Sequence, residues 1–157
     1  QFVCQSTTAT LGTASAKIRL SNTTPTAIWS LSVAPTDGPY ALWHGGGCHQ
    51  YDFDDPSGLP VGCIDGSDGD ASAGQLSVDP SSVVITPGGA CLNAGLTIGP
   101  TAKFTTSAPG ITLLNASGST QANCYWDITN VILSQTIPYQ TPAQQYVIGL
   151  TLTVVAN

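Results

Sequence analysis

Short stretches in which apolar and polar residues alternate recur along the chain, and each is bounded by turn-forming residues. A period of two places the apolar side chains on one face of a β-strand. In residues 27–33, for example, Trp29, Leu31 and Val33 share one face and the serines between them share the other. Similar patterns cover Leu76 and Val78 and a segment in which Cys124, Trp126 and Ile128 share a face, while residues 83–85 are a short apolar run and residues 111–114 follow a Pro-Gly turn. We expect a strand in each.

The clearest alternation is at the end of the chain, over residues 146–155. The apolar residues there point one way and the threonines the other, namely Ile148, Leu150, Leu152 and Val154 against Thr151 and Thr153. We therefore expect a final strand whose apolar residues share one face.

The composition disfavours helices. Glu and Met are absent, and Lys and Arg together number only 3, although these residue types favour helices. The chain holds 17 Gly and 11 Pro, which interrupt strands and form turns. No helical crossover pattern separates the expected strands, so they pair antiparallel. We predict an all-β fold: a single antiparallel β-sandwich, immunoglobulin-like or jelly-roll-like, forming one domain over residues 1–157, with residues 44–72 as one long acidic loop.

Charge excludes several classes of partner. Only 8% of the residues are charged and the net charge is −6. A nucleic-acid binder needs cations that replace the counterions of the phosphates, and an anionic membrane surface needs them too. No apolar run reaches the roughly 20 residues of a transmembrane helix. We expect neither a nucleic-acid partner nor a transmembrane segment.

Five cysteines in a chain of this composition predict a secreted protein with disulfides. A first residue of Gln1, without any Met in the chain, suggests a mature product that has lost a signal peptide. Our preferred pairs are Cys48–Cys63, which would close the acidic loop, and Cys91–Cys124. Cys4 would then be a free thiol or half of an intermolecular bridge, although spacing alone does not fix the pairs. Asn22 and Asn115 begin Asn-X-Ser/Thr triplets and are candidate glycosylation sites.

Six of the nine carboxylates crowd into residues 52–70, without a Lys or Arg among them. Each pair of like charges about 5 Å apart costs on the order of 1 kcal/mol near a surface. A bound cation would make the electrostatic energy of the cluster favourable. Calcium accepts many oxygen ligands in flexible geometry, although this is no EF-hand because the chain lacks Glu. We predict a calcium site; the alternative is a solvated acidic loop that promotes solubility. The expected ligands are Asp52, Asp54, Asp55, Asp65, Asp68 and Asp70, with Phe53 turned to the core.

Other chemistry has weaker support. His44, Cys48 and His49, with Asp52, are a conceivable transition-metal set, but the disulfide would take Cys48 and the adjoining glycines would position the ligands poorly. The chain lacks a nucleophile elbow, a zincin motif and a phosphate-binding loop, so we expect no enzymatic activity. Trp43, beside a Gly-rich segment, is the best candidate for an exposed sugar-stacking ring.

Two stretches resemble a known group of proteins. Residues 138–154 are similar to the closing strands of secreted bacterial surface β-sandwiches, including WxL-type and pilin- or coat-like domains. Trp29-Ser30-Leu31 resembles the WxL tripeptide itself, while Leu150 stands where WxL domains carry a second Trp. The resemblance implies a cell-surface or appendage protein and indicates no particular ligand.

Together these features predict a non-enzymatic structural subunit of an extracellular filament or cell-surface layer, stabilised by disulfides and calcium. Such a subunit would polymerise with itself by strand sharing. We expect residues 1–12 to be the donor strand, with Cys4 locking the joint. The alternative is a glycan-binding or adhesive module of a secreted surface protein.

Overall fold

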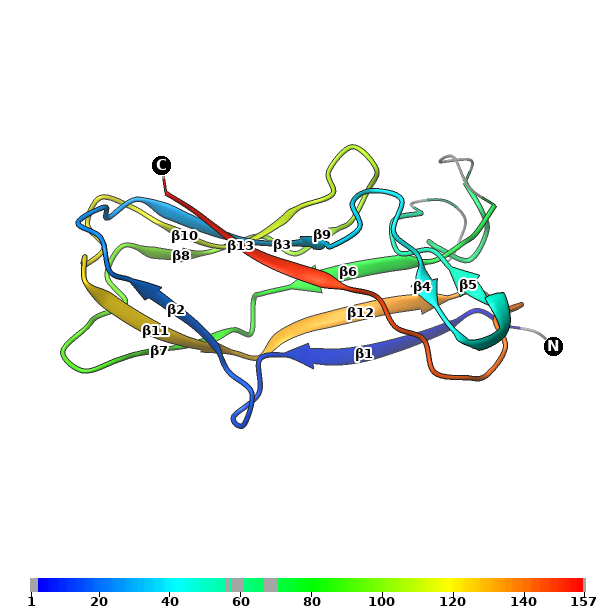
Figure 1. Ribbon diagram of the computed structural model, residues 1–157, viewed down its shortest axis with the longest axis horizontal. Coiled ribbons are helices and arrows are strands. Elements are labelled where there is room, and N and C mark those ends of the chain that lie inside the picture. Colours follow the sequence, from blue (N-terminus) through cyan, green and yellow to red (C-terminus); the bar gives the residue numbers. More distant parts are fainter. Residues whose placement is uncertain (1–2, 56, 58–60, 67–70, 157) are drawn as a thin grey trace.

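The computed structural model describes residues 3–55, 57, 61–66 and 71–156 (Figure 1). These residues form an elongated all-β structure whose strand pairs are all antiparallel. In Figure 1 the start of β1 (Gln5–Leu11) and the end of β13 (Leu150–Ala156) lie toward opposite ends of the long axis. Within the described residues, no helix is long and apolar enough to cross a membrane.

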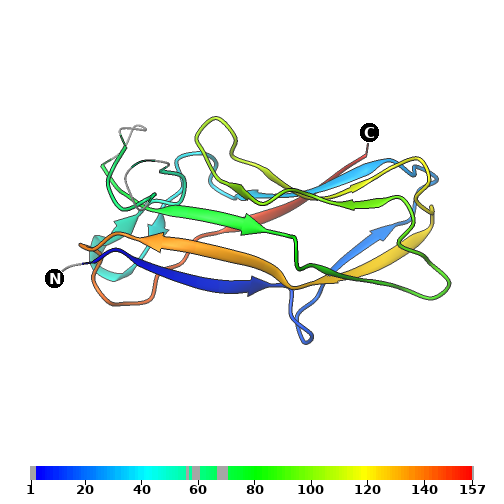
Figure 2. The same cartoon turned by 180° about the vertical axis from the view of Figure 1, so that it is seen from behind.

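One layer consists of two sheets that lie end to end (Figures 1 and 2). The sheet at the N-terminal end has the order β1-β12-β6-β9 and the other has the order β2-β11-β7. Their strands are β1 (Gln5–Leu11), β2 (Ile18–Asn22), β6 (Gln75–Asp79), β7 (Val84–Pro87), β9 (Ala102–Lys103), β11 (Cys124–Thr129) and β12 (Val131–Ile137). Asn130 makes the break between β11 and β12 with a φ of 67°, a conformation that asparagine tolerates better than most residues.

The second layer is a four-stranded sheet of order β13-β3-β10-β8. Its strands are β3 (Trp29–Pro35), β8 (Leu96–Ile98), β10 (Ile111–Ala116) and β13 (Leu150–Ala156). A register shift in β10 lies between Thr112 and Leu114, and both Leu113 and Leu114 are buried. At the N-terminal end of the sandwich, β4 (Trp43–His44) and β5 (Gln50–Tyr51) form a small hairpin around the 3-10 turn η1 (Gly46–Cys48).

A single apolar core joins the two layers. Trp126 and Ile128 of β11 are fully buried, and Trp29 of β3 approaches Trp126 with ring centroids 5.7 Å apart. The faces predicted from alternation are confirmed for the segments that contain Trp29, Leu76 and Trp126. The predicted all-β antiparallel sandwich is therefore the fold of this chain.

Strands that carry few apolar residues escaped the sequence pattern. β1 is exposed along six of its seven positions, and its sequence is mostly Gln, Ser and Thr. It pairs with β12 of the same chain over Gln5–Ile137 to Leu11–Val131. The expected use of residues 1–12 as a donor strand for another subunit is thus wrong for residues 5–11, because their own sheet already contains them.

The cysteine pairs differ in part from those expected. Cys91–Cys124 is confirmed, but Cys4 pairs with Cys63, and Cys48 is an exposed free thiol. The Cys48–Cys63 pair and the intermolecular role of Cys4 are therefore wrong. The physical reason is the β4–β5 hairpin, which turns Cys48 to the surface, while β1 brings Cys4 beside Cys63.

An ion pair holds the outer face of the β2–β11 sheet. Arg19 donates from Nε to Asp127 Oδ1 over 2.7 Å and from a terminal nitrogen to Oδ2 over 2.9 Å, and Lys17 lies 3.5 Å from the same carboxylate. The Arg19 guanidinium also lies over the Tyr125 ring, 4.8 Å from its centroid. The hydrogen bond from Arg19 is the main reason that the pKa of Asp127 lies below its usual value.

We expect Asp127→Asn to lower the urea midpoint of unfolding at neutral pH. Because the folded pKa is depressed, the stabilisation is complete above the unfolded pKa and is lost as the pH falls through the folded value. The difference between wild type and variant should therefore shrink only below pH about 4. Asp37→Asn, at an exposed turn, is the matched control. A difference independent of pH down to full protonation would contradict the ion-pair assignment.

Candidate functional site

The segment that follows β5 is built into the sandwich and does not begin a solvated loop. Phe53 is fully buried, and its ring meets Phe104 edge-on at 5.4 Å. Residues 52–55 run antiparallel to residues 73–76, with backbone hydrogen bonds from Asp52 to Ala73, from Asp55 to Gly74 and from Leu76 to Phe53. The expectation of one long loop over residues 44–72 is therefore wrong at its beginning, although Phe53 does point to the core as predicted. Backbone pairing closes the acidic segment where a disulfide was expected.

Gly74 permits this closure. Its φ is +149°, and a Cβ atom there would collide with the carbonyl oxygen of Asp52. Any other residue would therefore force the two strands of the closure apart.

Two buried glutamines attach the acidic segment to the long layer. Gln75 of β6 donates its side-chain amide to the carbonyl oxygens of Phe53 (3.1 Å) and Phe104 (2.9 Å). Gln135 of β12 donates to the carbonyl oxygen of Asp52 (3.1 Å) and accepts a hydrogen bond from the Trp43 indole (2.9 Å). Buried polar groups of this kind fix position because losing a partner costs about 1–3 kcal/mol. The alternation pattern indicated neither role, since an isolated Gln in a strand has no characteristic spacing.

The structure divides the predicted calcium ligands into groups. Asp52, Asp54 and Asp55 are buried, with exposed fractions of 1%, 2% and 0%. Asp52 accepts a hydrogen bond from the Phe53 amide, and Asp55 accepts one from the Ser57 amide. Asp65 is exposed, while Asp68 and Asp70 lie outside the described residues. The three cationic side chains are elsewhere: Lys17 and Arg19 bind Asp127, and Lys103 lies in β9.

In the part of the chain that is described, no three His, Cys, Asp or Glu side chains are grouped as metal ligands. The alternative set of His44, Cys48, His49 and Asp52 is therefore not brought together. His44 binds the Gln50 amide through Nδ1 at 2.8 Å and is exposed, whereas Asp52 is buried.

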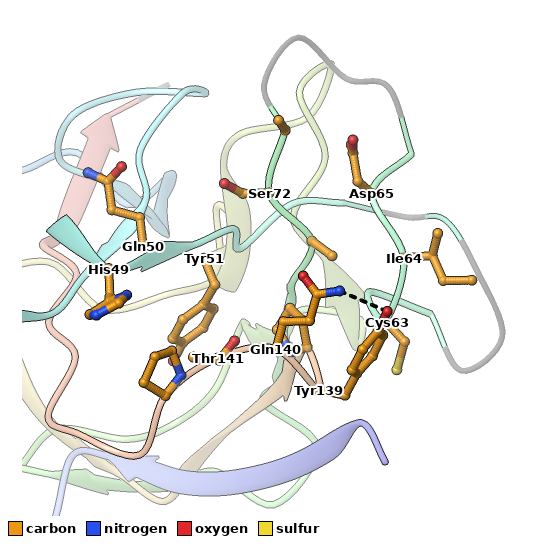
Figure 3. Close-up of a pocket in the computed structure, with 14 residues that line it drawn as sticks. His49, Gln50, Tyr51, Cys63, Ile64, Asp65, Ser72, Tyr139, Gln140 and Thr141 are labelled. Carbon is orange, nitrogen blue, oxygen red and sulfur yellow. Dashed lines mark hydrogen bonds between the residues drawn. The ribbon is translucent and has the colours of Figure 1, made fainter. Parts of the chain in front are cut away.

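A pocket of about 370 Å³ lies beside this segment at the N-terminal end of the sandwich (Figure 3). Polar side chains and backbone from four separate segments line it, namely residues 49–51, 63–65, 71–73 and 138–142. Tyr139 is 46% exposed, and the Gln140 amide donates to its hydroxyl over 2.9 Å. Asp65 contributes a carboxylate. The pocket therefore offers one accessible aromatic ring among groups that form hydrogen bonds.

Trp43 is not the exposed platform that the sequence suggested. Its ring stacks on Tyr51 with centroids 5.6 Å apart, and Tyr51 meets Tyr146 edge-on at 4.8 Å. Burial, followed by the nearby Tyr146, raises the pKa of Tyr51 to about 12, so its hydroxyl stays protonated at neutral pH. These three rings pack together beside the β4–β5 hairpin. Tyr139 is the accessible ring that was expected at Trp43.

The two glycosylation candidates differ in accessibility. The Asn22 side chain is buried and donates from its amide nitrogen to Thr26 over 2.6 Å, so folding occupies the atom that a glycan would need. Asn115 is exposed on β10.

Two of the outer strands, β1 and β13, carry no charge. β1 pairs only with β12, and β13 pairs only with β3, so each leaves one backbone edge open within the described residues. Each is seven residues long, without a charged or proline residue. Natural β-proteins commonly protect such edges with charges, prolines or covering segments.

Comparison of this chain with protein-family models, with curated proteins and with solved structures found no match. The resemblance to bacterial surface β-sandwiches stays a prediction from the sequence.

Proposed function

We propose that this protein is a non-enzymatic structural subunit of an extracellular filament or cell-surface layer, which associates with copies of itself through its open edge strands. The observation that carries this proposal is the pair of uncharged seven-residue edges, β1 and β13, in a chain whose net charge is −6. Identical acidic subunits repel each other wherever their charges meet. Edges without charge avoid that cost and offer unpaired N–H and C=O groups to a neighbour.

An extracellular location agrees with the covalent structure. The two disulfides join segments far apart in the sequence, with separations of 59 and 33 residues. Disulfides persist in oxidising compartments and are rare in the cytosol. Cys4–Cys63 also attaches the start of β1 to the acidic segment, which favours a rigid building block.

Self-association should be visible by sedimentation velocity and negative-stain microscopy. We expect the wild type to form oligomers or filaments as its concentration rises, and we expect Thr8→Lys in β1 or Thr153→Lys in β13 to reduce that association. Both side chains are exposed, so the fold should tolerate the change. Ser107→Lys, on an exposed turn, adds the same charge away from either edge and should leave association unchanged. A wild type that stays monomeric at every concentration would refute the proposed function.

Calcium at the acidic segment stays a prediction. Its support is the crowding of carboxylates in residues 52–70 and the burial of Asp52, Asp54 and Asp55, because burying ionised carboxylates is costly without compensation.

Removal of the metal tests it. A ligand that binds only the folded state at about 100 times its Kd adds about 2.7 kcal/mol to the free energy of unfolding. For a domain of this size that raises the Tm by roughly 5–10 °C. We therefore expect calcium to raise the Tm above the value in EDTA, and magnesium to have less effect. Asp65→Asn should weaken the calcium effect, whereas Asp37→Asn should preserve it. Equal Tm values in calcium and EDTA would remove calcium from the account.

A glycan-binding or adhesive module is the second candidate, favoured by the pocket beside Tyr139. An accessible aromatic ring among amide, hydroxyl and carboxylate groups suits the apolar face and the hydroxyls of a sugar. We expect binding to an array of neutral glycans to be lost in Tyr139→Ala and kept in Tyr40→Ala, which removes an exposed tyrosine outside the pocket. Loss in both variants, or in neither, would count against this pocket.

A further inference from the structure

The inner face of β13 is only partly covered by its own chain. The register with β3 places Leu152 opposite Val33 and Val154 opposite Leu31, so these side chains point to the same face as the core residues of β3. Val33 and Leu31 are buried, yet Leu152 and Val154 are 38% and 54% exposed. The sequence pattern predicted this shared face correctly, and the structure leaves its second half exposed. β13 therefore extends beyond the layer that should cover it.

A groove of about 180 Å³ opens beside this uncovered face, between β13 and the edge of β2. Leu20 and Trp29 form its core side, and Val154 and Ala156 form its β13 side. Trp29 is buried, and its indole nitrogen donates to no acceptor within the described residues. The sandwich is incompletely packed at this place.

The absence of charged residues from this sheet indicates which partner its edge could bind. The four strands of the β13-β3-β10-β8 sheet contain no charged residue, although the chain carries nine carboxylates. A second copy can therefore approach this sheet edge without opposing like charges along the strands. The sequence of β13 also suits pairing with itself, because the residues on either side of Thr153, Leu152 and Val154, are both apolar and share one face.

We propose that β13 of one subunit pairs antiparallel with β13 of a second copy, centred on Thr153. This inference rests on the proposed self-association and names its contact. In this register Leu152 lies opposite Val154 of the second copy, and Thr153 lies opposite itself. A slip of one strand by one residue would place the apolar inner face of one copy beside the outer face of the other, so the faces exclude that register. The two four-stranded sheets become one continuous sheet, and the exposed inner faces of both β13 strands lie side by side.

Directed cross-linking tests the register. Directly opposed residues in an antiparallel pair have Cα atoms about 4.5–5.5 Å apart, within the range that a disulfide requires. Thr153→Cys in a Cys48→Ser background should therefore give a covalent dimer on a non-reducing gel under mild oxidation. Thr151→Cys in the same background should not, because the two residues 151 would lie roughly 14 Å apart along the strands.

A charge swap gives a second readout. Thr153→Lys and Thr153→Asp should each weaken the dimer alone, and an equal mixture of the two should restore it in sedimentation velocity. The pairing of β13 with β13 would be wrong, while self-association stands, if the wild type associates but Thr153→Cys cross-links no more than Thr151→Cys and the charge mixture does not restore the dimer. A foreign strand or ligand in the groove would give that same result. If the wild type never associates, both proposals fail.

Discussion

Backbone hydrogen bonding at the edges of the two layers is the constraint on which the rest of this structure depends. Interior strands satisfy their N–H and C=O groups on both sides, but every open sandwich leaves edges that do not. At the N-terminal end the chain solves the problem locally, because residues 52–55 pair with residues 73–76 and two buried glutamines supply further donors. Along β1 and β13 no such device is present in the described residues, and the charge that usually deters association is absent too.

The strands that the sequence predicted are those whose two faces differ in environment. Trp29, Leu31 and Val33 face the core while serines face outward, so the period of two survives in the sequence. β1 could not be found in this way because nearly all of it is exposed, and the environment imposes little alternation on it. β13 shows the converse: alternation identified its inner face, but burial depends on whether the opposite layer reaches that far, which is a property of the whole fold.

The site was harder to predict than the fold because its contacts are long-range. The segment with the clustered aspartates was expected to be part of one long loop, yet Phe53 and the backbone pairing draw Asp52, Asp54 and Asp55 inside. Cysteine spacing favoured Cys48–Cys63, which are near in sequence, whereas the actual partner of Cys63 is 59 residues away and was brought there by β1. Gln75, Gln135 and Tyr139 carry no motif, and only the three-dimensional arrangement identifies them.

The placement of β1 and β13 has a mechanical consequence. In Figure 1 the start of β1 and the end of β13 lie toward opposite ends of the long axis, and both strands run broadly along it. Tension along this axis would load β13 in shear against β3, so that the hydrogen bonds of the pair share the load and do not break one by one. At the other end the Cys4–Cys63 bond carries the load past β1, because Cys4 precedes that strand. In the proposed filament, a subunit with this arrangement would resist stretching along its long axis.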